Sequence, residues 1–123
     1  MSHATGGIAR VPHGVANAIL LPHGMEYNFE VCKVKYARLA PVMGETVSGL
    51  SVDEAARKAI QAIRNLIRRL NALDAIPMRL KAAGVPEESL SLIAEAAVED
   101  GTTVYNPREV VADDILVHLK NAY

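Results

Sequence analysis

Apolar residues recur along most of this chain at the three- and four-residue spacing of an α-helix. The clearest case spans residues 51 to about 73, where Ser51 and Glu54 also have the identity and spacing of a capping box. A second stripe lies in a helix that Pro86 opens and that continues to residue 98. The two predicted stripes consist of Ala56, Ile60, Ile63, Ile67 and Leu70, and of Leu90, Ile93, Ala94 and Ala97.

The remaining segments also predict helices. Residues 14–27 are apolar on nearly every side, which indicates a buried helix with a kink or break at Pro22. Gly44 should end a helix over residues 30–43, and Gly84 should end a short one that follows Ile76-Pro77 and runs to residue 83. A last helix is expected over residues 110–120. Since no alternating strand pattern is present, we predict an all-α helical bundle in which residues 1–123 form one helical domain.

Composition narrows the class of protein. Half of the 123 residues are hydrophobic but only 4% are aromatic, which suits closely packed helices rich in small aliphatic side chains. The net charge of −1 provides no field that would attract nucleic acid or an anionic membrane. No apolar run is long enough to span a bilayer. The single cysteine, Cys32, excludes an internal disulfide and favours a reducing, cytoplasmic location.

Three histidines stand ten residues apart, at His3, His13 and His23, and the last two lie in identical Pro-His-Gly tripeptides. At His13 a predicted helix begins, and its positive end disfavours an imidazolium. The neutral imidazole that remains is the form that binds metal ions. On spacing alone, the alternative is a helix-capping or core histidine.

The histidines belong to a longer pattern. It reads Ser-His-Ala-Thr-Gly-Gly from residue 2 and Pro-His-Gly-Val-Ala-Asn-Ala-Ile-Leu-Leu-Pro-His-Gly from residue 12. This run resembles the metal-site signature of the iron-containing alcohol dehydrogenases. Near the other end, Asp100 followed by Asn106-Pro107-Arg108 is similar to a second signature of that family. The resemblance covers the last third of such enzymes and implies the fold of their C-terminal helical domain.

The resemblance also implies roles for particular residues. His13 would be one ligand of a divalent metal, and His3 would take part in substrate binding or proton transfer. Thr102 and Thr103 would line the substrate pocket. His23 is expected to be a hydrogen-bonded histidine at a helix break, without a catalytic role, and His118 to be a surface residue.

The Asn-Pro-Arg segment also has a purely structural explanation. Asn106 can cap the final helix, with Pro107 at its first position and Glu109 at its third.

The reaction that the resemblance implies is hydride transfer between an alcohol or aldehyde substrate and NAD or NADP, assisted by iron(II) or another divalent metal. No glycine-rich nucleotide motif occurs in this chain, so it offers no cofactor-binding residues of its own. We therefore expect the chain alone to be inactive and to hold metal weakly, as the C-terminal part of a longer enzyme. The alternative is a free-standing helical module that serves binding or assembly.

If the nucleotide-binding part is separate from this chain, some apolar surface of the chain would be left uncovered. We expect residues 15–21 and the segment before Asn106 to be exposed in a monomer, which favours a homo-oligomer or cover by an N-terminal domain.

Overall fold

The computed structural model describes residues 1–73 and 76–123, and these residues are helical with no strand among them. Its elements are α1 (Ser2–Ala9), α2 (His13–Tyr27), α3 (Phe29–Val42), α4 (Val52–Asn71), the 3₁₀ helix η1 (Glu87–Ser89), α5 (Leu90–Glu99), the 3₁₀ helix η2 (Gly101–Tyr105) and α6 (Ala112–Ala122). The all-α prediction is confirmed.

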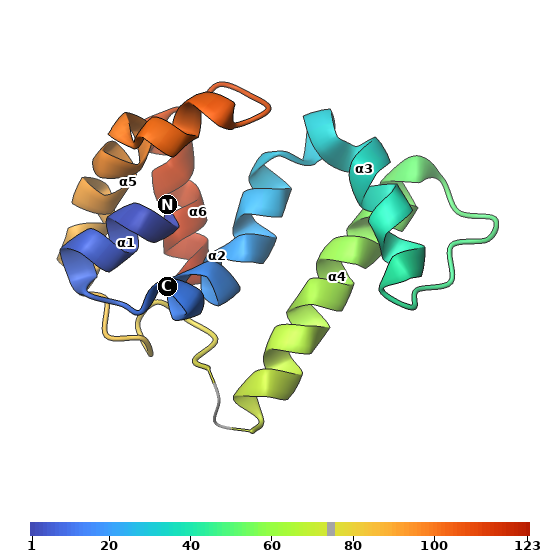
Figure 1. Cartoon of the computed structure of the whole chain (residues 1–123), viewed down its shortest axis with the longest axis horizontal. Helices are drawn as coiled ribbons and strands as arrows, with labels where there is room; N and C mark the ends of the chain where they lie inside the picture. Colours follow the sequence, from blue (N-terminus) through green and yellow to red (C-terminus); the bar gives the residue numbers. More distant parts are fainter. Residues whose placement is uncertain (74–75) are drawn as a thin grey trace.

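Helix α2 runs through the middle of the molecule (Figure 1). On one side of it lie α1, α5 and α6, and on the other the helical hairpin of α3 and α4. Its first turns contribute Ile19 and Leu20 to a large apolar core, while Met25 packs with Phe29 and Ile60 in a smaller one. Each half of the molecule is therefore fixed against the same helix.

Helix α4 forms as predicted, and the helix predicted from Pro86 begins as the 3₁₀ helix η1 and continues as α5. Ser51 and Glu54 make both hydrogen bonds of the capping box, since the Ser51 hydroxyl accepts from the Glu54 N–H and the Glu54 carboxylate accepts from the Ser51 N–H. In α5 the whole predicted stripe is buried, namely Leu90, Ile93, Ala94 and Ala97.

The sequence predicted a kink or a break at Pro22, and of these the break is wrong, because α2 continues through Pro22. A proline inside a helix costs about 3 kcal/mol because it removes one hydrogen bond and crowds the preceding turn. Ile19 and Leu20 before it and Met25 after it are all buried, in the two apolar cores. Burial of such side chains contributes about 1.5–3 kcal/mol each, which outweighs the proline.

Helix α1 was not predicted, because its sequence contains Gly6-Gly7 and no capping side chain. Ala4 and the fully buried Thr5 instead hold it in place against α2 and α5. The space around residue 6 favours glycine, because a Cβ there would meet the Val11 carbonyl oxygen at 3.3 Å. Arg10, with a φ of 56°, then turns the chain into α2.

The short helix predicted up to residue 83 is absent, and turns take its place. The buried Leu80 donates its N–H to the Ala122 carbonyl at the end of α6, and its own carbonyl accepts from the Val85 N–H. The Leu80 N–H therefore bonds to α6 and not to a carbonyl within a local helix. Gly84, which was expected to end that helix, has a φ of 85° and lies at the end of the turns instead.

The final helix begins later than predicted, at Ala112, and Asn106 does not cap it. Asn106 is instead the C-terminal cap of η2, and Val111, which precedes α6, has an extended backbone. The 106–111 segment is thus a connection whose side chains make contacts elsewhere.

The exposure of the apolar segments was only partly predicted. Within residues 15–21, Ile19 and Leu20 are each 2% exposed, because α2 is covered by neighbouring helices of its own chain, and of the large side chains only Leu21 is substantially exposed. Val104 and Tyr105, just before Asn106, are 78% and 87% exposed as expected. None of the described helices is long and apolar enough to cross a membrane.

Candidate functional site

The turn between α1 and α2 brings His3 and His13 together. Their rings are stacked, with centroids 5.0 Å apart and planes 22° apart. His3 lies in the first turn of α1 and His13 opens α2, and both are exposed. The two histidines that the sequence assigned to proton transfer and to metal binding are therefore neighbours.

Asp100, at the end of α5, orients His3. Its Oδ2 atom lies 2.9 Å from His3 Nδ1. Hydrogen bonds from the Thr102 hydroxyl and N–H to Oδ1, and the neighbouring His3, lower the pKa of Asp100 to about 2. An ionised carboxylate can only accept hydrogen bonds. The Nδ1 atom of His3 therefore carries a hydrogen and donates the hydrogen bond to Asp100. The Nε2 atom of neutral His3 is then the basic nitrogen.

Thr102 and Thr103 both line a cavity of about 320 Å³ between α2 and the segment around η2. Their hydroxyls are also used locally. Thr102 donates to Asp100 at 2.7 Å, and Thr103 donates to the Ala97 carbonyl at 2.6 Å. The pair thus borders a cavity and at the same time fixes η2 to the end of α5.

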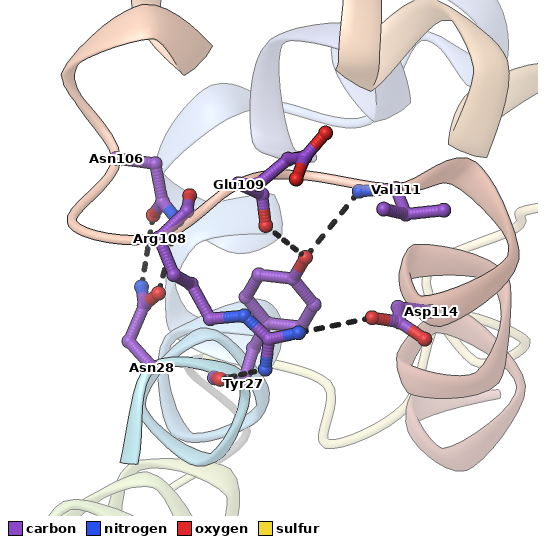
Figure 2. Close-up of polar contacts among 7 residues, drawn as sticks. All are labelled: Tyr27, Asn28, Asn106, Arg108, Glu109, Val111 and Asp114. Carbon is purple, nitrogen blue, oxygen red and sulfur yellow. Dashed lines mark hydrogen bonds and ion pairs between the residues drawn. The ribbon is translucent and has the colours of Figure 1, made fainter. Parts of the chain in front are cut away.

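The 106–111 segment is fastened to the end of α2 by a polar network around Tyr27 (Figure 2). The Tyr27 hydroxyl donates to the Glu109 carbonyl at 2.7 Å, and the Arg108 guanidinium lies 4.2 Å from the Tyr27 ring centroid. Asn28 and Asn106 exchange side-chain hydrogen bonds. Arg108 also donates to the Tyr27 carbonyl and pairs with Asp114 of α6.

This network gives the Asn-Pro-Arg signature a role that the sequence analysis missed. Asn106 and Arg108 tie the chain just beyond η2 to the end of α2 and the residue that follows it. The sequence offered only a weak signal for this network, because Asn106 stands in the second signature but its partner Asn28 is 78 residues away and lies outside the patterns described above.

A second group of metal-binding residue types lies at the middle of the molecule. One ligand atom each of His23, Glu26 and His118 lies within 4.8 Å of the others, with two residues from α2 and one from α6. His118 is therefore not a plain surface residue, and its ring meets the Tyr27 ring edge-on at a centroid distance of 5.4 Å. The spacing of the Pro-His-Gly repeats did not reveal this group, because His118 comes from a distant part of the chain.

Both imidazoles of this second group are only partly solvated. The Nδ1 atoms of His23 and His118 are buried and have no hydrogen-bond partner among the described residues. The expectation that His23 is a hydrogen-bonded histidine is thus wrong for this atom. Burial lowers the pKa of both histidines, while the nearby Glu26 carboxylate opposes that shift.

The metal ligand that the sequence predicts, His13, stands at the beginning of α2 with its imidazole exposed. In residues 1–73 and 76–123 the one three-residue group of metal-binding side chains is that of His23, and His13 is not in it.

Comparison with known proteins agrees with these features. Residues 1–123 match the C-terminal part of the Fe-containing alcohol dehydrogenase family. The chain is 43% identical over 116 residues to lactaldehyde reductase of Escherichia coli K12, covering 94% of this chain and 29% of that protein. It is 42% identical over its full 123 residues to 1,3-propanediol dehydrogenase of Klebsiella pneumoniae, covering 31% of that protein.

A solved structure of 1,3-propanediol oxidoreductase has the same fold. It superposes with a TM-score of 0.92 at 40% identity over 99% of this chain and 31% of the other. The chain thus spans less than a third of the length of these relatives.

Proposed function

The chain belongs to the Fe-containing alcohol dehydrogenase family, and we propose that its 123 residues form a helical domain that supplies part of the active site of a nicotinamide-dependent alcohol dehydrogenase. The observation that carries this proposal is the pairing of His3 with His13 beside Asp100. These residues come from three helices, so the fold must assemble them. The substrate class is a small alcohol or aldehyde.

His13 would provide one ligand of iron(II) or a similar divalent ion, through a neutral imidazole at the beginning of α2. The ion, when bound, would supply positive charge that favours the alkoxide form of an alcohol. The other ligands and the NAD- or NADP-binding residues would come from outside this chain.

His3 would move the proton that accompanies hydride transfer. Asp100 keeps the proton of the neutral ring on Nδ1, which leaves Nε2 free to take a proton and release it again. Stacking on His13 at 5.0 Å holds His3 next to the proposed metal ligand. Asp100 is in this scheme a positioning residue, because it acts through His3.

Thr102 and Thr103 would form the wall of the substrate cavity nearest to Asp100. Because both hydroxyls donate within the chain, their oxygens could contact substrate only as further acceptors. The free cysteine, Cys32, suits a reducing compartment such as the cytoplasm.

Val104 and Tyr105 form an exposed surface. Their exposure favours a second role for this surface, which is compatible with the role in the active site. We propose that it is covered in the working enzyme, either by the nucleotide-binding part or by another copy of the chain. Light scattering over a dilution series of the purified chain distinguishes these outcomes, since only self-contact makes the measured mass depend on concentration.

A chimera tests the main proposal. The N-terminal part of E. coli lactaldehyde reductase would be joined to this chain in place of the segment that the chain matches. We expect this chimera, supplied with iron(II), to reduce lactaldehyde with a nicotinamide cofactor, and the isolated chain to be inactive. A folded, metal-loaded chimera without turnover would overturn the proposal.

A further inference from the structure

A cavity of about 380 Å³ opens beside His23 and Glu26, between α2, α4 and the turns after α4. His23 and Glu26 are three residues apart on α2 and so lie on one face of that helix. His118 of α6 completes the group, with its ligand atom within 4.8 Å of the other two. A small ion could reach these groups from the solvent through the cavity.

The three ligand atoms lie near enough for one ion once the side chains move toward it. In a tetrahedral zinc site two ligands bound at about 2.1 Å lie about 3.4 Å apart. Ligand atoms that are up to 4.8 Å apart therefore have to approach one another by up to about 1.4 Å. Two imidazoles and one carboxylate are a known ligand set for zinc, which leaves a fourth position for water.

The local charges decide which class of ion is suitable. Glu26 is paired with Arg64 at 2.6 Å, and Arg79 also lies near His23. On the other side Arg108 and Asp114 act on His118. A carboxylate has about four acceptor positions, so Glu26 can keep Arg64 and still bind an ion. With a single carboxylate among its three ligands and several guanidinium groups nearby, the site suits an ion that prefers imidazole and not a hard cation such as magnesium.

The group is separate from the histidine that the proposed function uses. His23 lies ten residues beyond His13 on the same helix, which is about 15 Å along its axis. The Nδ1 atoms of His23 and His118 are buried and have no hydrogen-bond partner in residues 1–73 and 76–123, and a buried nitrogen of this kind is costly unless something binds it.

We propose that His23, Glu26 and His118 form a second divalent-metal site, of the zinc class, that clamps α2 to α6. This site is independent of the iron site and of catalysis. A bound ion would join two helices of the large core that are otherwise in contact through apolar side chains.

The test is titration of the purified, metal-free chain with cobalt(II), followed by displacement with zinc. We expect one equivalent of cobalt per chain and the strong visible absorption of a four-coordinate nitrogen and oxygen site, which zinc abolishes. The His118→Leu and Glu26→Gln variants should each weaken binding by more than about tenfold, because each removes a direct ligand, whereas loss of a residue that only orients a ligand already costs about 10- to 100-fold.

The matched control is His13→Gln, which removes an exposed imidazole from the same helix and should leave the cobalt affinity unchanged. Circular dichroism checks that each variant folds, and Glu26→Gln, at a partly exposed position, keeps the test valid should His118→Leu unfold. Equal affinities in the wild type and Glu26→Gln, or loss of binding in His13→Gln alone, would overturn the proposal.

Discussion

Two groups of side chains in this molecule contain the same chemical parts, each with two histidines and one carboxylate. His3, His13 and Asp100 form the first at the beginnings of α1 and α2. The second consists of His23, His118 and Glu26 and lies further along α2. Both groups therefore join α2 to another helix, and they differ in exposure and in what holds the carboxylate.

In the first group the carboxylate is held by a neutral neighbour, Thr102, and gives its second oxygen to a half-exposed histidine. In the second group an arginine holds the carboxylate, and burial lowers the pKa of both histidines. An exposed, oriented imidazole can exchange a proton with substrate, whereas two half-buried imidazoles whose Nδ1 atoms have no partner in the part of the chain that the structure describes are suited to an ion. The surroundings thus assign different chemistry to identical residue types.

The largest expected effect is on catalytic activity, which we expect to depend on the first group. In the chimera with the N-terminal part of lactaldehyde reductase, His13→Ala should lower kcat/KM by more than about a hundredfold, because it removes a proposed metal ligand and not merely a residue that orients one. Iron content measured on the same samples should fall in parallel.

An exposed residue outside both groups provides the control for this experiment. Glu88→Gln in η1 should leave kcat/KM of the chimera unchanged. If His13→Ala retained both its iron and its activity, the assignment of the first group to catalysis would be wrong.

The sequence predicted the first group far better than the second. His13 and His3 lie in a dense local pattern, so their roles could be proposed without a fold. Asp100 was visible as part of a signature, but its contact with His3 bridges 97 residues and depends on the packing of α1 against α5. The second group had only His23 as a marker, and its partner on α6 was wrongly expected at the surface.

The same reason separates the helices that were predicted from those that were not. Local signals, such as the capping box of Ser51 and Glu54, correctly placed α4. Tertiary contacts decided the other cases. Burial carries α2 across Pro22, packing folds the glycine-rich α1, and the Leu80 amide bonds to α6 in place of forming a local helix.

The next prediction compares the two groups by the effect of zinc on thermal stability. A ligand that binds only the folded state stabilises it by about 2.7 kcal/mol at a hundred times its dissociation constant. We expect saturating zinc to raise the Tm of the wild type and of His13→Gln, but not that of His118→Leu. Calorimetry of chelator-treated and zinc-loaded samples measures this, and a zinc-induced shift of equal size in all three proteins would contradict the distinction between the groups.

Tyr27 lies between the second group and the segment that follows η2, and Tyr27→Phe tests its contribution to each. Its ring contacts His118, and its hydroxyl holds the 106–111 segment that follows η2. Loss of the hydrogen bond to the Glu109 carbonyl should cost about 1 kcal/mol of unfolding free energy in urea. Since phenylalanine keeps the ring, the cobalt affinity of the second group should not change. A variant as stable as the wild type would show that the 106–111 segment is held by Asn106 and Arg108 alone.

The smallest effect concerns acid stability and isolates the first group. The pKa of Asp100 is lowered from 3.8 to about 2 in the folded chain, mainly by Thr102 and then by His3. Between these values the unfolded chain binds the proton and the folded chain does not, so the contribution of Asp100 to stability is present above pH 3.8 and is lost as the pH falls toward 2.

Asp100→Asn should therefore be less stable than the wild type near neutral pH, and the difference in stability should shrink over that acid range. Urea unfolding of metal-free protein at several pH values measures the slope. Thr102→Val, which removes the hydroxyl part of the strongest cause, should reduce the slope in the same direction, and an unchanged slope in both variants would mean that Asp100 titrates alike in the folded and unfolded chain.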